Sequence, residues 1–289
     1  MTVASATPPV VERARRIGSA IVSRPLAALD DLGAQLSFYA RSLFWSYRTL
    51  LRYKKEVVRL LAEVSLGTGA LAVVGGTVGV IAFLTFFTGT EVGLQGYAAL
   101  NQLGVSNFTA FISAYFNTRE IAPLVAGLAL SATVGCGFTA QLGAMRISEE
   151  IDALEVMAVP SIPFLVTSRI IAGFIAVIPL YVIGLLSSYF ASRVIVVSYY
   201  HQSGGTYDHY FHLFLPPLDI VWSFFKVLVF SVVIILTHCY FGYNAKGGPA
   251  GVGVAVGRAV RTSIVAVTIF DFFLSLAIWG STTSVRLAG

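Results

Sequence analysis

The sequence predicts an all-α polytopic membrane protein with an N-terminal interfacial amphipathic helix, five transmembrane helices and a short cytoplasmic helix between the second and third spans. The chain of 289 residues is 56% hydrophobic and 11% charged, whereas a soluble domain carries about 25% charged residues. Its apolar residues gather in long runs, and about 20 such residues in a row cross a bilayer core. Its two cysteines lie inside these runs, which argues against a disulfide framework.

The first 60 residues are the basic part of the chain, with ten of its nineteen Lys and Arg residues. Residues 1–30 show little pattern, which predicts a mobile cytoplasmic tail. Over 31–60, apolar and aromatic residues recur every three or four positions, and basic residues line the other side. This pattern predicts an amphipathic helix in the interface of an anionic leaflet, with a soluble packing helix as the alternative.

Residues 61–289 are predicted to form the membrane domain. The first apolar run, 64–87, makes a helix of ~36 Å at 1.5 Å per residue, enough to cross with some tilt. The second span lies between Glu120 and Arg146, and the other three are 162–197, 220–241 and 262–279. The connection 198–217 is aromatic and polar, as expected of an interfacial loop, and 242–261 is a glycine-rich connection.

Basic residues decide the orientation, because they are enriched in cytoplasmic segments. With the N-terminus inside, the inner segments hold fourteen Lys and Arg residues and the outer segments hold three. The N-terminus is therefore predicted in the cytoplasm and the C-terminus on the periplasmic side of the inner (plasma) membrane. The N-terminal residues lack the apolar core of a cleavable signal peptide.

A short charged segment follows the second span. Arg146 ends the apolar run, and four carboxylates then fall within seven residues. On a helix over 147–157, Ile151 and Leu154 share one face and carboxylates occupy another. Pro160 ends the helix. We interpret this helix as a docking element for a protein outside the membrane.

Charges inside spans are costly and mark candidate functional sites. Lys226, Arg119 and Glu120 are expected to meet toward the outer side, where they suit the head of an anionic amphiphile; a structural ion pair is the alternative. Asp271 in the fifth span is either a hydrogen-bonded packing residue or a functional one. Arg169, near the start of the third span, is predicted to snorkel to the inner headgroups rather than to act functionally.

Catalytic and cofactor motifs are missing from the sequence. It has no G-x-x-x-x-G-K frame, no H-E-x-x-H and no G-x-S-x-G, so we expect neither catalysis nor a cofactor in this chain. Asp208, His209 and His212 make zinc conceivable, but neighbouring side chains seldom point at one centre, and we expect no metal. The basic residues flank spans rather than cover a soluble surface, which argues against a nucleic-acid partner.

Several short motifs form one pattern. They are G-L-Q-G-Y at 93–97, R-E-x-x-P at 119–123, T-A-x-x-G-x-M at 139–145, Glu149, M-A-V at 157–159, Lys226, G-Y-N-A at 242–245 and D-F at 271–272. Together they resemble the MlaE/YrbE permease family, the membrane subunits of ABC transporters that work with MCE proteins. The long basic N-terminal segment makes the chain look more like an actinobacterial YrbE B-type subunit of an Mce lipid-import complex than like a proteobacterial MlaE.

The resemblance implies a second permease subunit, two cytoplasmic ABC ATPase subunits that bind ATP and Mg²⁺, MCE-domain proteins on the periplasmic side, and a lipid substrate. It implies that the short charged helix is the coupling helix held by the ATPase, with the contact residues Arg146, Glu149, Glu150, Ile151, Asp152, Leu154, Glu155 and Met157. The lipid-binding positions that it implies are Val92, Ala99, Leu100, Leu103, Arg119, Glu120 and Lys226.

Two positions depart from the family pattern, since Thr133 and Gln141 stand where members often carry Arg and Glu. A homodimer would then have a less polar interface, so we expect a heterodimer with a different YrbE-type chain. The expected cargo is a fatty or mycolic acid or a sterol, moved between the MCE tube and the inner membrane in a direction left open. The alternatives are a non-transporting anchor for the MCE proteins and an ion-coupled secondary transporter.

Overall fold

The computed structural model describes residues 30–66 and 76–280, and the regular structure within these two ranges is entirely helical. The chain divides into two compact units, residues 1–44 and 45–289. In the first unit, the described residues 30–44 form one helix, and most of the predicted tail lies outside the described residues.

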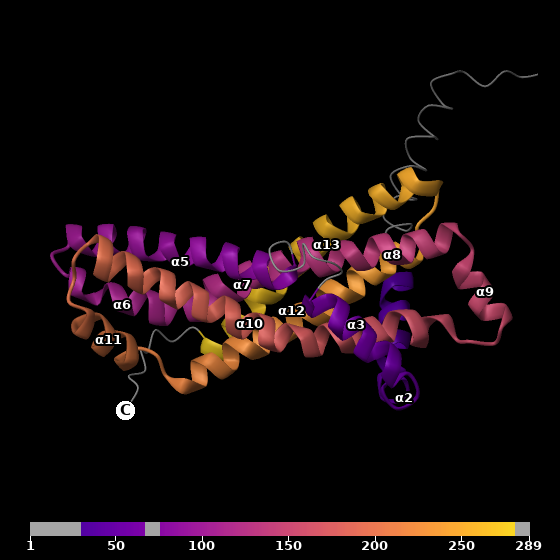
Figure 1. Cartoon of the computed structure of the whole chain (residues 1–289), viewed down its shortest axis with the longest axis horizontal. Helices are drawn as coiled ribbons and strands as arrows, with labels where there is room; N and C mark the ends of the chain where they lie inside the picture. The colour runs from indigo at the N-terminus through magenta and orange to yellow at the C-terminus, as the bar shows by residue number, and fades with distance from the viewer. Residues whose placement is uncertain (1–29, 67–75, 281–289) are drawn as a thin grey trace, which may run out of the picture. The chain divides into compact units, whose positions relative to one another are not determined.

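Within the described residues, five helices of the second unit are long and apolar enough to span a bilayer, which confirms the prediction of an all-α protein with five candidate spans (Figure 1). They are Thr77–Gln102 (α5), Ser106–Ile147, Ile162–Tyr199, Pro217–Tyr243 (α12) and Gly248–Trp279 (α13).

The first span lies later in the chain than the sequence predicted. The apolar run 64–87 suggested a crossing there, but α3 (Lys54–Leu66) ends at the start of that run and α5 extends well past its end. Residues 67–75, inside the predicted span, lie outside the described residues. The predicted span ends before Glu91 because a charged residue marks its limit in the sequence. In the structure α5 continues through Glu91, whose side chain is exposed.

Short π-helical stretches interrupt the second span and form both ends of the third. The second is built from 3₁₀ turn η1 (Ser106–Phe108), α6 (Thr109–Ile112), π-helix η2 (Ser113–Ile121), α7 (Ala122–Leu130), π-helix η3 (Ser131–Gly135) and α8 (Cys136–Ile147). The third is built from π-helix η4 (Ile162–Thr167), α10 (Ser168–Val194) and π-helix η5 (Ile195–Tyr199). Such π segments often mark functional sites, and η2 carries Arg119 and Glu120.

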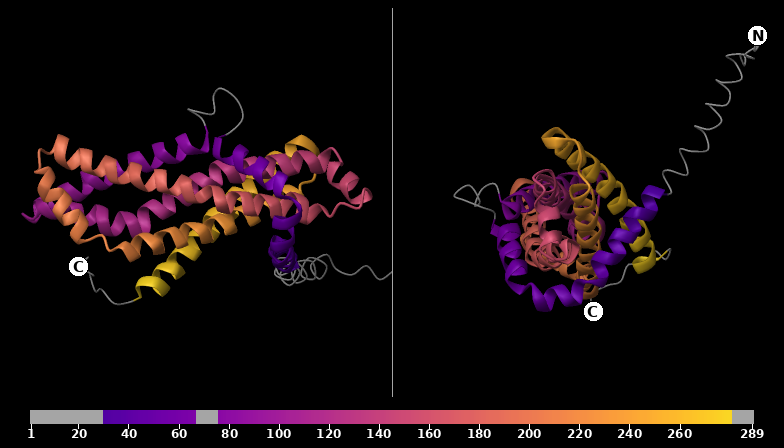
Figure 2. Two further views of the ribbon diagram at one scale, coloured as in Figure 1. Left: turned by 60° about the horizontal axis from the view of Figure 1, so that its bottom comes forward. Right: turned by 90° about the vertical axis from the view of Figure 1, so that its right-hand side faces the viewer.

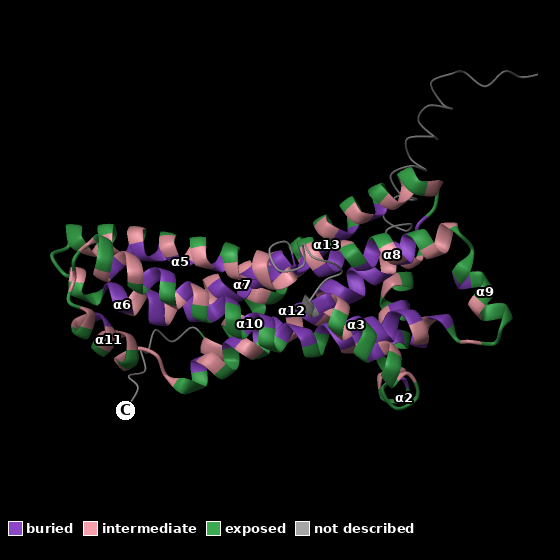
Figure 3. Cartoon of the chain, in the orientation of Figure 1, coloured by how far each residue is buried: buried purple, intermediate pink, exposed green. Residues whose placement is uncertain are grey.

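Small residues allow the spans to approach closely. A Cβ at Gly89 of α5 would overlap the backbone carbonyl of Ser188 on α10, and one at Gly242 of α12 would lie 2.8 Å from the Thr139 carbonyl oxygen on α8. Close backbone contact of this kind is how membrane helices pack. The buried residues accordingly line the inside of the bundle (Figure 3).

The fifth span is the least covered. Only 17% of its most apolar window is buried, against 56% for the second span. Figure 2 shows α13 crossing the other spans obliquely. Most of its apolar surface therefore faces either lipid or a partner.

The predicted helix over 31–60 is interrupted. Breaks at Trp45 and Tyr53 separate the helix of residues 30–44 from α2 (Ser46–Arg52) and from α3. On α3, Val57 and Leu60 pack against Ala172 of α10, so this apolar face is covered by protein.

The connections between spans contain more helix than the sequence indicated. The link predicted as a loop over 198–217 contains α11 (Gly204–Leu213), and Ser203 caps it by accepting a hydrogen bond from the Thr206 backbone N–H at 3.4 Å. The fifth span begins at Gly248 within the predicted link, because its glycines did not break the helix. Helix α9 (Glu150–Val156) lies at the opposite end of the bundle from α11 (Figure 1). We call these the α9 end and the α11 end.

Candidate functional site

A cluster of charged side chains joins three spans. Lys226 of α12 is completely buried. Its Nζ donates hydrogen bonds to the Arg119 carbonyl oxygen at 2.8 Å, to Glu120 Oε2 at 3.1 Å and to Ser275 Oγ at 2.7 Å. The Asp271 carboxylate lies 2.7 Å from the same Nζ but at an angle that makes no directed hydrogen bond, so this contact is mainly an ion pair.

A second ion pair lies beside the first. Arg119 Nε donates to Asp219 Oδ2 at 2.7 Å, and Nη2 lies 2.6 Å from the same oxygen. The Arg119 guanidinium also covers the Tyr115 ring at 3.7 Å from its centroid. The other Asp219 oxygen accepts a hydrogen bond from Trp279 Nε1 at 3.0 Å. Both charged side chains are only 7% exposed.

The R-E-x-x-P motif explains how this cluster is built. In a regular α-helix the backbone N–H of residue 123 would donate to the Arg119 carbonyl, but Pro123 has no N–H. The local backbone is π-helical, and the Arg119 carbonyl accepts from Lys226 instead. The proline thus leaves an acceptor for a lysine on another span.

The charge balance of the cluster disfavours an anionic headgroup. Its described side chains include two cations, Lys226 and Arg119, and three carboxylates, Glu120, Asp219 and Asp271. Both cations are buried and paired, and the most accessible member is Glu120, whose side chain is 40% exposed. An anionic head would therefore meet a carboxylate first. The structure brings the three predicted residues together in one ion-pair cluster, an arrangement that favours the structural alternative.

Sequence reasoning missed Asp219 and did not join Asp271 to the cluster. Asp219 follows a pair of prolines in the first turn of α12, where an acidic residue suits the helix dipole, so its signal resembled that of an ordinary helix start. Asp271 was predicted to be either a hydrogen-bonded packing residue or a functional one; in the structure it forms an ion pair with Lys226.

The four predicted apolar lipid positions lie along one stripe of α5 and its C-terminal end. Val92 is 7% exposed, Leu100 is half-buried, and Ala99 and Leu103 are exposed, the last by 74%. The stripe therefore passes from the protein interior to an open apolar surface at the α11 end.

Helix α9 is held rigidly at the opposite end. Glu149 precedes it with φ 60° and Ala158 follows it with φ 58°, both in the left-handed region. At its C-terminus the Val159 N–H donates to the Leu154 carbonyl at 2.9 Å and the Ala158 N–H to the Glu155 carbonyl at 3.0 Å. These two bonds form a Schellman motif, in which glycine usually occupies the Ala158 position.

Several predicted coupling residues are engaged inside the chain. Ile151, one of the predicted ATPase contacts, has no exposed surface in this chain, so its side chain is not open to a partner. Arg146 pairs with Asp152 at 2.6 Å. Glu155 accepts hydrogen bonds from Ser161 at 2.6 Å and from the Tyr243 hydroxyl at 3.2 Å. The amphipathic pattern identified the buried face but could not say that this chain itself covers it.

The outward surface of α9 is formed by other residues. Glu149 and Glu150 are exposed, Leu154 is half-buried, and Val156 and Met157 are exposed by 88% and 65%. Two large apolar side chains at the tip of a charged helix make a surface suited to a protein partner.

Arg169 does not snorkel. It is 3% exposed, and its guanidinium donates to the Leu165 carbonyl at 2.7 Å and to Gln141 Oε1 at 3.2 Å. The Gln141 amide in turn donates to Glu63 of α3. One of the two positions that depart from the family pattern thus belongs to an internal polar network. At the other, Thr133 donates to the Ala129 carbonyl of its own helix at 2.7 Å.

A buried histidine that the sequence did not single out ties α12 to the second and fifth spans. His238 Nδ1 contacts Thr139 Oγ1 at 2.8 Å, and Nε2 contacts the Ser131 and Ser263 hydroxyls at 3.1 and 3.2 Å. Gly135 leaves room for the ring, because a Cβ there would lie 2.7 Å from His238 Cδ2. Ser131, Gly135 and Thr139 recur every four residues, and this spacing of small and hydroxyl side chains on one helix face was the sequence signal for a polar contact with another span.

The histidines of α11 do not share a ligand set with Asp208. The Asp208 carboxylate receives two hydrogen bonds from Arg193, at 2.8 and 2.9 Å, and these bonds hold its pKa below the usual range. Burial raises the pKa of neighbouring Tyr207. These contacts favour a structural role for the polar outer connection.

Comparison with known proteins identifies the family. The family model described as Permease MlaE matches residues 67–277. A Rickettsia bellii protein named "Probable ABC transporter permease protein" is 31% identical over 68% of this chain and 76% of its own length. The Arabidopsis thaliana protein TRIGALACTOSYLDIACYLGLYCEROL 1, chloroplastic, is 30% identical over 69% of this chain and 57% of its own length. The Haemophilus influenzae intermembrane phospholipid transport system permease protein MlaE is 25% identical over 68% of this chain and 75% of its own length. The chain belongs to the MlaE permease family.

Proposed function

We propose that this chain is the membrane subunit of an ABC transporter that moves lipid, with ATP hydrolysed by separate subunits. The observation that carries the proposal is α9, a short helix locked between two spans with an exposed apolar tip. ATP-driven closure of ATPase subunits moves a membrane domain only through a stiff contact, and α9 supplies one.

Displacement of α9 would reach several spans at once. It follows α8 after Ser148 and Glu149 and is joined to η4 by five residues, and Glu155 ties it to Ser161 and Tyr243. Through the Tyr243 contact, a displacement of α9 is transmitted to α12, the span that contains Lys226.

The charged cluster then serves to tie moving spans together rather than to bind a headgroup. Lys226 holds the second and fifth spans through Glu120 and Asp271, and Arg119 holds the start of α12 through Asp219. The open part of the α5 stripe, Ala99 to Leu103, offers the apolar surface for acyl chains.

The proposed cargo is a phospholipid, because the Haemophilus relative is named for intermembrane phospholipid transport. The proposed partners are a second permease chain, two ATPases and MCE-domain proteins, with the N-terminus cytoplasmic and the C-terminus periplasmic. The finer placement as a YrbE B-type subunit rests on the basic N-terminal segment, and the relatives named above lend it no support. Heterodimer formation rests on Thr133 and Gln141.

Reconstitution of the chain with its ATPase partners in vesicles tests this function. We expect transfer of a fluorescent phospholipid to require ATP hydrolysis and to persist when ionophores collapse all ion gradients. Transfer driven by a gradient without ATP would establish a secondary transporter, and MCE-protein binding without transfer would establish an anchor.

A further inference from the structure

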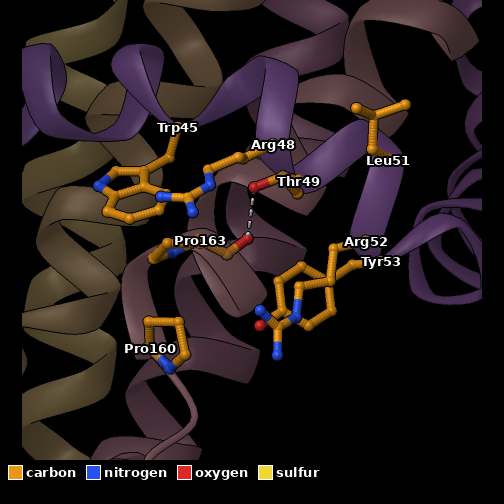
Figure 4. Close-up of a pocket in the computed structure, with 8 residues that line it drawn as sticks. All are labelled: Trp45, Arg48, Thr49, Leu51, Arg52, Tyr53, Pro160 and Pro163. Atoms are coloured by element: carbon orange, nitrogen blue, oxygen red, sulfur yellow. Dashed lines mark hydrogen bonds between the residues drawn. The ribbon is translucent and has the colours of Figure 1, made fainter.

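A cavity at the α9 end of the bundle lies between α2 and the start of the third span. It measures about 360 Å³ and is lined by Trp45, Arg48, Thr49, Leu51, Arg52, Tyr53, Pro160 and Pro163 (Figure 4). We call it the α2 cavity. Ligand sites span about 300–1,000 Å³, so it suits a headgroup rather than a whole two-chain lipid.

Two arginines flank the α2 cavity. Arg48 and Arg52 are four residues apart on α2, which places them on one side of the helix, and both are exposed. Among the residues that the structure describes, no carboxylate forms an ion pair with either. The Arg48 guanidinium lies over the Trp45 ring, 5.3 Å from its centroid, which orients it beside the cavity (Figure 4).

The other residues that line the cavity are mostly apolar, and contacts within the chain hold them in place. Thr49 is fully buried and donates to the Pro163 carbonyl at 3.3 Å, which fixes α2 against η4. The Tyr53 ring packs edge-on against Phe164, with centroids 5.3 Å apart. Pro163 is the second residue of a candidate membrane-spanning helix, so the cavity lies near one end of that span. Tryptophan and tyrosine are enriched where spans meet the membrane–water interface.

We propose that the α2 cavity binds the headgroup of an anionic phospholipid, with Arg48 and Arg52 pairing with the phosphate. Guanidinium groups bind phosphate oxygens in a bidentate manner, and basic pockets beside spans recognise anionic lipid heads. Trp45 and Tyr53 contact the glycerol and the upper acyl chain. The site is separate from the lipid path proposed for transport, because the α5 stripe opens at the α11 end.

Native mass spectrometry of the full chain tests the proposal, using mixed micelles with equal amounts of phosphatidylglycerol and phosphatidylcholine. The wild-type chain is expected to retain phosphatidylglycerol preferentially. The double variant R48Q/R52Q should retain one phosphatidylglycerol fewer per chain, with about tenfold or greater loss of affinity at that site. The matched control is K54Q/K55Q, which removes two exposed charges just outside the cavity and should behave as wild type.

Further arms separate the alternatives. R48K/R52K keeps the charge but loses bidentate geometry, and it should bind phosphatidylglycerol more weakly than wild type. Equal losses in R48Q/R52Q and K54Q/K55Q, or equal retention of both lipids by wild type, would overturn the proposal. Displacement of the lipid by millimolar inorganic phosphate would identify a free phosphate site instead and would also overturn it. In a Cys136→Ser background, protection of the buried Cys239 from a thiol-reactive dye verifies that each variant is folded.

Discussion

Removal of the Lys226 ammonium is the perturbation that separates a structural cluster from a headgroup site. Lys226→Met keeps most of the side-chain volume but leaves Asp271, only 14% exposed, without a cation, and leaves the Arg119 carbonyl without its donor. Breaking a buried pair from one side costs about 3–5 kcal/mol. Glu120 adds less because its side chain is 40% exposed and reaches solvent.

The compensating change gives the sharper test. Lys226→Met combined with Asp271→Leu removes both charges, so no unpaired buried ion remains between α12 and α13, and we expect about 2 kcal/mol to be recovered. The control is Lys246→Met, an exposed lysine in the link between the same two helices, which should change stability by less than about 0.5 kcal/mol.

Denaturant unfolding of the purified chain measures these differences. Cys239 is completely buried and Cys136 is partly exposed, so in a Cys136→Ser background the reaction of Cys239 with a thiol-reactive dye reports unfolding. A Lys226→Met chain as stable as wild type but unable to support lipid transfer would refute the structural reading and restore a direct role of Lys226 in lipid binding.

Three further outcomes are expected. In a background without native cysteines, Gly205→Cys should react with an impermeant thiol reagent in intact cells and Ser148→Cys should not; the exposed Gly205 is preferable to Ser203, which caps α11. Gly89→Val should destabilise the fold by at least about 1–3 kcal/mol, because its side chain meets the α10 backbone, as denaturant unfolding would show. Because the folded-state pKa of Asp208 is depressed, its pair with Arg193 should stabilise the chain above about pH 4 and be lost as the pH falls through the folded pKa, and Asp208→Asn should abolish this dependence at a cost below about 1 kcal/mol.

Each outcome has a contradicting result. Labelling at residue 148 but not 205 would reverse the proposed orientation and remove α9 from the ATPase side. A Gly89→Val chain as stable as wild type would mean that α5 and α10 separate freely at this crossing. Identical acid unfolding of the wild type and Asp208→Asn would show that the exposed pair contributes nothing.

The spans could be predicted from the sequence because hydrophobic runs report directly on the bilayer. Their ends could not, because polar residues such as Glu91 continue a helix at the interface, and the glycines after Gly247 continue one as well. The meeting of Lys226, Arg119 and Glu120 was predictable since buried charges need partners.

The role of the cluster formed by Lys226, Arg119 and Glu120 depends on residues that are distant in the sequence. Asp219 and Asp271 add two carboxylates to the predicted group of two cations and one carboxylate, and only the packing of three spans brings them there. Arg169 is similar: a long side chain near a span end usually snorkels, but Gln141 and the Leu165 carbonyl hold it inside. Helix periodicity likewise identified the apolar face of α9, but which partner covers Ile151 is a property of the tertiary fold.

Coupling through α9 is the central claim, and co-purification of the ATPase with α9 variants tests it most directly. Val156→Asp with Met157→Asp places two charges at its exposed tip, where each apolar anchor contributes roughly 1.5–3 kcal/mol when buried by a partner. We predict at least about tenfold weaker ATPase association with normal insertion of the permease, while Leu103→Asp at the α11 end leaves association unchanged. Undiminished co-purification with the double variant would contradict the assignment of α9 as the coupling element.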